Sequence, residues 1–153
     1  MKWSLLVIAL IAAATMAYVF LSSRTKSSTL SIDGRITYKI DIASTAMAQA
    51  KGLSGREMLA DDAGMLFVFG SAAPRYFWMH DMLIPLDVLW IRDGHIIGLQ
   101  ANIPHPAANN GQTATFQSND PADMALEINA GDIAKHGLSV GQAVSIDKND
   151  DSR

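Results

Sequence analysis

The 153-residue chain contains no cysteine, so disulfides, a thiol nucleophile and cysteine-based zinc sites are excluded. It also has no basic run: 12 Lys and Arg stand against 15 Asp and Glu, a formal net charge of −3 at pH 7. Nucleic-acid binding needs a basic patch or stripe, so we predict no nucleic-acid partner. For the same reason we do not expect the surface of the folded domain to bind anionic lipid.

Several catalytic and metal-binding motifs are missing as well. There is no Gly-x-Ser-x-Gly nucleophile motif and no glycine-rich phosphate loop. No two of the four histidines lie three to five residues apart, a spacing typical of zinc ligands. The sequence therefore predicts no cofactor and no zinc site.

Residues 3–21 form a long run without charge. As a helix these residues would extend roughly 28 Å, close to the thickness of the hydrocarbon core of a bilayer. We interpret residues 1–23 as a membrane anchor or a signal peptide. In a signal peptide, Thr15 and Ala17 would provide the small residues before the cleavage site. A buried core helix is the third alternative. Lys2 balances Arg24 and Lys26, so the positive-inside rule hardly decides the orientation.

The remaining chain divides into a short linker, one domain and a polar tail. We assign residues 24–29 to the linker, 30–147 to the domain and 148–153 to the tail. Without the first 23 residues the chain has 11 Lys and Arg against 15 Asp and Glu, a net charge of −4. About 130 residues suffice for a core of their own. We expect the domain to face the periplasm or cell exterior, either anchored to the membrane by its N-terminal helix or secreted after cleavage.

The first half of the domain shows short strands and one helix. Asp33-Gly34 is a turn signal, and residues 36–42 alternate apolar and polar side chains with the period of a half-buried strand. Residues 44–51 are typical of a short helix with Ser44 as its N-cap and Gly52 just past its end. The continuous apolar run 65–69 indicates a strand buried on both faces.

The second half is also predicted to be mostly β. Residues 76–79 form a short aromatic strand, and Asp93-Gly94 joins strands 86–92 and 95–103 as a tight hairpin. A long loop over 104–115, an alternating strand over 124–129, a helical turn over 130–135 and a last strand over 140–146 follow. The predicted fold is therefore mostly β, a barrel or sandwich of about seven strands with two or three short helices.

The order of four motifs resembles the domain of unknown function 192 family, a set of small proteins that are often exported. The motifs are Gly52-Leu53 with Arg56, Gly64-Met65-Leu66-Phe67, Phe77-Trp78-Met79 and Ile84-Pro85-Leu86-Asp87. The resemblance covers about residues 30–147. It implies a compact, mostly β fold with a few short helices, and it implies no particular activity.

The chain departs from this family at three places. His80 and Asp81 stand where the family tends to have a basic residue followed by Asn. No Cys lies near Pro104 and Pro106, where the family often carries one, so any role that depends on that Cys is in doubt. Gly141-Gln142 replaces a common Gly-Asp pair.

Asp87 is an acidic residue within an apolar strand, between Leu86 and Val88. A buried carboxylate needs a cation or backbone N–H groups as partners, and Arg56 is the natural candidate. Such a pair would hold the glycine-rich segment 52–56 against the strand. Three roles remain open for Asp87: a structural clamp, part of a ligand-binding pair, or a catalytic carboxylate.

The simplest interpretation of residues 78–82, Trp-Met-His-Asp-Met, is a strand end with polar residues exposed to solvent. Two functional interpretations are also open, a copper site and a ligand pocket. Thioether and imidazole groups suit copper, although Met fills irregular cores more often than it binds metal. The aromatic face of Trp78 also suits a sugar-like or other flat ligand beside a polar rim. We therefore predict a pocket formed by Arg56, Trp78, His80, Asp81 and Asp87.

These observations favour a non-enzymatic envelope domain that binds a small molecule, a polymer or a protein. The alternative from another class is a hydrolase of an envelope substrate that uses Asp87 with His80 or His105. A Met/His copper-handling protein is the third hypothesis.

Overall fold

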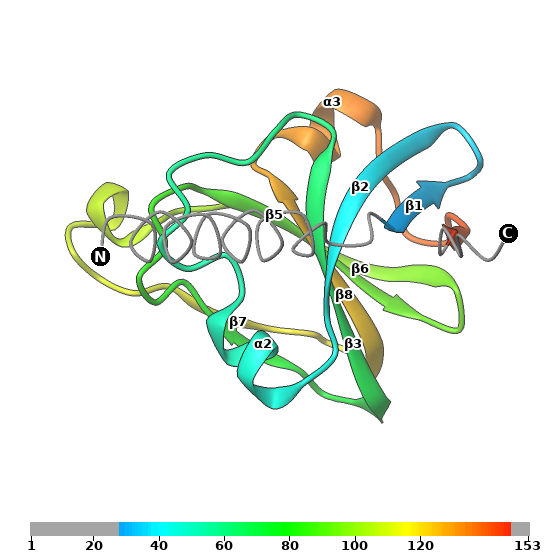
Figure 1. Ribbon diagram of the computed structural model, residues 1–153, viewed down its shortest axis with the longest axis horizontal. Helices are drawn as coiled ribbons and strands as arrows, with labels where there is room; N and C mark the ends of the chain where they lie inside the picture. Colours follow the sequence, from blue (N-terminus) through cyan, green and yellow to red (C-terminus); the bar gives the residue numbers. More distant parts are fainter. Residues whose placement is uncertain (1–27, 148–153) are drawn as a thin grey trace, which may run out of the picture.

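The computed structural model describes residues 28–147, which form a curled seven-stranded sheet and a separate two-stranded ribbon (Figure 1). The large sheet has the strand order β6-β5-β8-β3-β2-β1-β9, and the ribbon pairs β4 with β7. The strands are β1 (Ser28–Ile32), β2 (Ile36–Ala43), β3 (Ala63–Ala73), β4 (Tyr76–Trp78), β5 (Leu86–Arg92), β6 (His95–Ile103), β7 (Thr115–Gln117), β8 (Ala122–Asn129) and β9 (Val144–Asp147). The helices are α2 (Ala46–Lys51), the 3₁₀ turn η1 (Pro106–Asn109) and α3 (Asp132–His136).

The sheet curls until its two edge strands approach each other. His95, at the start of β6, forms an antiparallel bridge with Ala143, directly before β9. The Val144 N–H donates to the Gly94 carbonyl over 2.8 Å. The prediction of a mostly β fold is confirmed in this form, a half-barrel with two short α-helices in the described residues, and the ribbon adds two short strands.

The two faces of the sheet carry two separate cores. The inner core lies within the curl and contains side chains from all seven strands, among them Tyr38, Leu66, Leu89 and Leu126. The outer core lies on the opposite face, where Met65, Phe67, Val88, Trp90 and Ala125 pack under α2 and the β4–β7 ribbon. Because both faces are covered, β5 is buried at every position except Arg92.

The local turn signals are confirmed. Asp33-Gly34 and Asp93-Gly94 both adopt positive φ angles, from 50° to 70°, as the two central residues of a type I′ turn require. The strands joined by Asp93-Gly94 have the predicted bounds, 86–92 and 95–103.

Other boundaries differ from the prediction. The N-cap of α2 is Thr45, whose Oγ1 accepts from the Ala48 N–H over 3.2 Å, and not Ser44. Residues 79–82 form a turn, in which the Met82 N–H donates to the Met79 carbonyl, so the aromatic strand ends at Trp78. The last strand begins at Val144 because residues 139–142 form a turn, and the loop 104–115 contains η1.

The predicted anchor or signal peptide, residues 1–23, lies outside the described residues, as do most of the linker and the tail 148–153. Within residues 28–147, no helix has the length and apolar character needed to cross a membrane.

Candidate functional site

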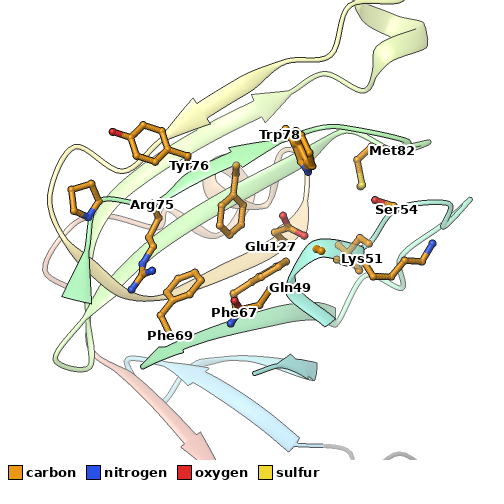
Figure 2. Close-up of a pocket in the computed structure, with 15 residues that line it drawn as sticks. Gln49, Lys51, Ser54, Phe67, Phe69, Arg75, Tyr76, Trp78, Met82 and Glu127 are labelled. Atoms are coloured by element: carbon orange, nitrogen blue, oxygen red, sulfur yellow. The ribbon is translucent and has the colours of Figure 1, made fainter. Parts of the chain in front are cut away.

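A pocket of about 420 Å³ opens on the outer face of the sheet, between α2 and the start of β4. Its volume falls in the range typical of small-molecule sites. Figure 2 shows Arg75 and Phe69 at one end, Lys51 and Ser54 at the other, and Glu127 between them. Aromatic side chains from β3 and β4 supply most of its apolar surface: Phe67, Phe69, Tyr76, Phe77 and Trp78.

Glu127 is the buried polar group of this pocket. Its side chain belongs to β8, the strand between β3 and β5, where Met65 and Val88 are its cross-strand partners. Only 6% of the residue is exposed, and Oε2 has no hydrogen-bond partner among the described residues. Burial raises the pKa of the Glu127 carboxyl from 4.5 to about 8, because the charged form loses its hydration. The carboxyl is therefore mostly protonated at pH 7.

The alternation of β8 explains why Glu127 reaches the outer core. Leu126 and Ile128 point into the inner core, and Ala125 lies in the outer core on the same face as Glu127. Gly64 lets β3 approach the strand closely here, since a Cβ at Gly64 would lie 2.8 Å from the Glu127 carbonyl oxygen. The Gly-Met-Leu-Phe motif thus includes the residue that allows this close contact.

Phe77 closes the pocket from the ribbon side. Its ring packs edge-on against Phe67, at 4.8 Å between centroids, and against Trp90, at 5.1 Å. Trp78, the next residue of β4, points the other way and is 62% exposed at the rim. The ribbon thus places one aromatic ring inside the pocket and one at its opening.

The uncharged polar side chains of the rim bond to the backbone. The Gln49 amide donates to the Val68 carbonyl over 2.8 Å and to the Ala43 carbonyl over 3.3 Å. The Ser54 hydroxyl donates to the His80 carbonyl over 3.0 Å. These bonds fix α2 and the segment after it against β3 and the turn 79–82.

Arg75 is also held in place by hydrogen bonds to the backbone, and its side chain lines the pocket. Its Nε donates to the Ala122 carbonyl over 3.1 Å, and its Nη2 donates to the Ser71 carbonyl. The guanidinium lies 3.9 Å above the centre of the Phe69 ring, a cation–π contact.

Asp87 does not pair with Arg56, and this prediction was wrong. Asp87 is fully buried, and its two carboxylate oxygens accept from backbone N–H groups, Oδ1 from Asn102 over 2.7 Å and Oδ2 from Ile133 over 2.8 Å. The bond to Ile133 caps the first turn of α3, where Gly131 has no side chain to do so. Asp87 therefore acts as a clamp between β5, the end of β6 and α3, with amides in place of the expected guanidinium.

Arg56 pairs instead with Asp41 of β2, at 2.6 Å between Nη2 and Oδ2. This pair borders a separate hollow formed by residues 39–41, 56, 58–60 and 63–64. Half-exposed carboxylate and guanidinium groups on neighbouring segments meet more readily than a surface arginine and a buried carboxylate on the far side of the sheet.

The turn 79–82 separates the residues of the predicted copper motif. Met79 and Met82 are buried in the outer core, whereas His80 and Asp81 point into solvent, with 3.5 Å between His80 Nε2 and Asp81 Oδ2. Asp81 has a φ of 54°, so the alternation expected of a strand does not apply here. No group of three His, Asp or Glu side chains suited to a metal occurs in residues 28–147.

Of the five predicted pocket residues, Trp78 alone lines the pocket around Glu127. His80 lies beside it, 5.5 Å from the Trp78 ring, while Arg56 and Asp87 lie elsewhere. Sequence reasoning missed Glu127 as a buried group, because its alternation with Leu126 and Ile128 is also typical of a strand with one wet face. The available signal was its neighbour on that face, Ala125, which is not polar.

Comparisons with known proteins agree with this architecture. A family model described as an uncharacterised ACR, DUF192, matches residues 28–146. A crystal structure of a protein of unknown function from Novosphingobium aromaticivorans is 30% identical, with a TM-score of 0.69 over 78% of this chain and 83% of that one. A crystal structure from Sinorhizobium meliloti, described as a "putative transcription regulator", is 29% identical, with a TM-score of 0.71 over 79% of this chain and 95% of that one.

A comparison with the curated proteins found no match. The family model spans nearly all of the described residues, and both solved structures share their fold. The chain therefore belongs to the DUF192 family, the domain of unknown function 192.

Proposed function

We propose that this domain is a non-enzymatic binding module that holds a small molecule in the pocket around Glu127. The observation that carries the proposal is a carboxyl group, 6% exposed, whose Oε2 has no partner among the described residues and which lines an aromatic pocket. Leaving a buried polar group without a hydrogen bond costs about 1–3 kcal/mol. A ligand that bonds to Glu127 would offset this cost.

The arrangement favours binding over catalysis. General acid–base catalysis generally needs a second group in hydrogen-bond reach of the reacting atoms. The uncharged polar side chains Gln49 and Ser54, which also line the pocket, already donate to backbone carbonyls. The hydrolase alternative relied on Asp87, whose oxygens are both occupied by backbone N–H groups on the other face of the sheet.

The compartment is part of the proposal. We place the pocket in the periplasm or outside the cell, because the uncharged run 3–21 suits an anchor or an export signal. We propose no nucleic-acid partner, although one solved relative is described as a regulator of transcription. Residues 28–147 contain 7 Lys and Arg against 13 Asp and Glu, a balance that repels phosphates.

A thermal-shift screen of the full chain with envelope sugars, short peptides, metals and small aromatic compounds tests the proposal. The affinity of each compound that raises the melting temperature is then measured for Glu127→Leu. This variant replaces the carboxyl group with an apolar side chain of similar size. We expect these compounds to lose affinity for Glu127→Leu. His80→Ala, a change at an exposed side chain outside the pocket lining, is the matched control and should bind as the wild type does.

Two outcomes would contradict the proposal. One is a set of ligands that bind Glu127→Leu as well as the wild type, which would place their site elsewhere. The other is a screen in which no compound shifts the melting temperature of the folded wild-type protein.

A further inference from the structure

The charged side chains around the pocket are mostly basic. Arg75 and Lys51 line its two ends, and Glu127, between them, is the single acidic residue among those that line it in the described part of the chain. The lining thus carries a net positive charge whether Glu127 is protonated or ionised. A cationic ligand would meet repulsion in both states, whereas an anion would be attracted most strongly when Glu127 is neutral.

Arg75 is the better placed of the two cations. Its bonds to the Ala122 and Ser71 carbonyls and its contact with Phe69 fix the guanidinium within the lining of the pocket. Nη1 makes no hydrogen bond within the described residues, so it is free to donate to an incoming oxygen. In Figure 2 the Lys51 side chain extends away from Glu127. Its ammonium group would therefore attract an anion at the mouth of the pocket and would not bind it beside Glu127.

We propose that the ligand of this pocket is a small amphipathic anion, with an apolar or aromatic body and a carboxylate. The carboxylate binds at Arg75, and the body lies over Glu127 against the rings of Phe67, Phe77 and Trp78. This inference rests on the proposed function, since it names the class of molecule that the same site takes. Guanidinium groups suit carboxylates because their N–H groups match the two oxygens.

Glu127 then makes the affinity depend on pH. Its cross-strand neighbours, Met65 on β3 and Val88 on β5, do not ionise. The titratable or charged side chains that line the same pocket are Lys51 from α2 and Arg75 and Tyr76 from the ribbon side. Burial raises the pKa of the Glu127 carboxyl to about 8. Below that pH the carboxyl is neutral and does not oppose the anion; above it, a carboxylate repels the anion.

Three probes with one aromatic body separate the ligand classes: naphthylacetate as the anion, naphthylethanol as the neutral analogue and naphthylethylammonium as the cation. Their affinities for the full chain are measured by titration calorimetry from pH 6 to pH 10. At pH 7 we expect naphthylacetate to bind more tightly than the other two probes. Above pH 8 its affinity should fall by about tenfold per pH unit, the limit when binding requires the protonated carboxyl. Naphthylethanol should show a smaller loss.

Variants assign the effect to single residues. Glu127→Gln keeps a hydrogen-bond donor and cannot ionise in this range, so the loss of naphthylacetate affinity above pH 8 should disappear. Arg75→Gln should weaken naphthylacetate about tenfold and leave naphthylethanol nearly unchanged. Because Arg75 also bonds to the backbone, Lys51→Gln serves as a second, milder variant, with an expected loss of about threefold for the anion alone. Arg92→Gln, in the β5–β6 hairpin, is the matched control.

The outcomes distinguish this inference from the proposed function. If naphthylethylammonium binds more tightly than naphthylacetate, or gains affinity between pH 6 and pH 8, the pocket binds ligands but the anionic class is wrong. Equal affinities of all three probes would also overturn the inference. If none of the three binds the folded protein, the proposed ligand class is refuted, whereas the proposed function is decided by the thermal-shift screen.

Discussion

Replacing Glu127 with glutamine should stabilise the protein at neutral and alkaline pH. The Glu127 carboxyl lies almost fully within the outer core, where burial raises its pKa from 4.5 to about 8. Glutamine has nearly the same shape and remains neutral throughout this range. The substitution therefore removes the cost of keeping this carboxyl protonated at a pH where the unfolded chain releases the proton, and it leaves the packing of Phe67 and Phe77 in place.

The magnitude follows from proton linkage. Between pH 4.5 and pH 8 the folded protein holds a proton on Glu127 that the unfolded chain has released. The free energy of unfolding of the wild type therefore falls as pH rises, by about 1.4 kcal/mol per unit from this residue. Over the whole interval the loss amounts to about 5 kcal/mol, and above pH 8 it stays constant. The advantage of Glu127→Gln should grow by the same amount over the same interval.

Urea unfolding of the wild type and Glu127→Gln at each unit from pH 4 to pH 9, followed by tryptophan fluorescence, measures this difference. The difference between the two proteins cancels the contributions of the other carboxyl groups, including Asp33 and Asp62, whose pKa values hydrogen bonds lower in the folded state. Glu57→Gln, the same chemical change at an exposed position, is the control and should give a flat difference. A flat difference for Glu127→Gln as well would refute the burial of an unpaired carboxyl.

Two further predictions concern the strands that position the pocket. Gly64→Ala should destabilise the fold by about 1–3 kcal/mol, because its Cβ would lie 2.8 Å from the Glu127 carbonyl oxygen. A Cβ at Gly70, on the same strand, would meet nothing within 4 Å, so Gly70→Ala should change stability little. Thermal unfolding of the two variants tests this difference. Asp87→Asn should lower the free energy of unfolding by about 2–3 kcal/mol, because it weakens two buried bonds to backbone N–H groups. Asp41→Asn should lower it by under about 1 kcal/mol, because its partner Arg56 is half exposed. Similar losses for both variants in urea unfolding would contradict this assignment.

Local sequence signals predicted much of the fold. The hairpin around Asp93-Gly94 has the predicted bounds because its turn type requires two residues that tolerate positive φ, and few residue pairs do. The helix before Gly52 is set by similar short-range chemistry, a capping hydroxyl and a terminal glycine, although Thr45 took the place of Ser44. Signals of this kind act over a few residues and need no knowledge of strand order.

The site depended on contacts between distant segments, and these were not predictable from the pattern. The apolar neighbours of Asp87 correctly indicated a buried carboxylate in need of partners. Its partners are the amides of Asn102 and Ile133, 15 and 46 residues away, and they carry no side-chain signal in the sequence. Arg56 met Asp41 because the parallel pairing of β2 with β3 brings those segments together, a long-range pairing that alternation along one strand does not reveal.

Two buried carboxyl groups on neighbouring strands, Asp87 on β5 and Glu127 on β8, have opposite surroundings. Both oxygens of Asp87 accept backbone N–H groups, so its burial stabilises the fold. Oε2 of Glu127 has no such partner in the described residues, and its strand lies between β3 and β5, where neither backbone can shift without breaking the sheet. A polar group held this rigidly loses little entropy when a ligand bonds to it, so the feature that weakens the free domain would strengthen its complex.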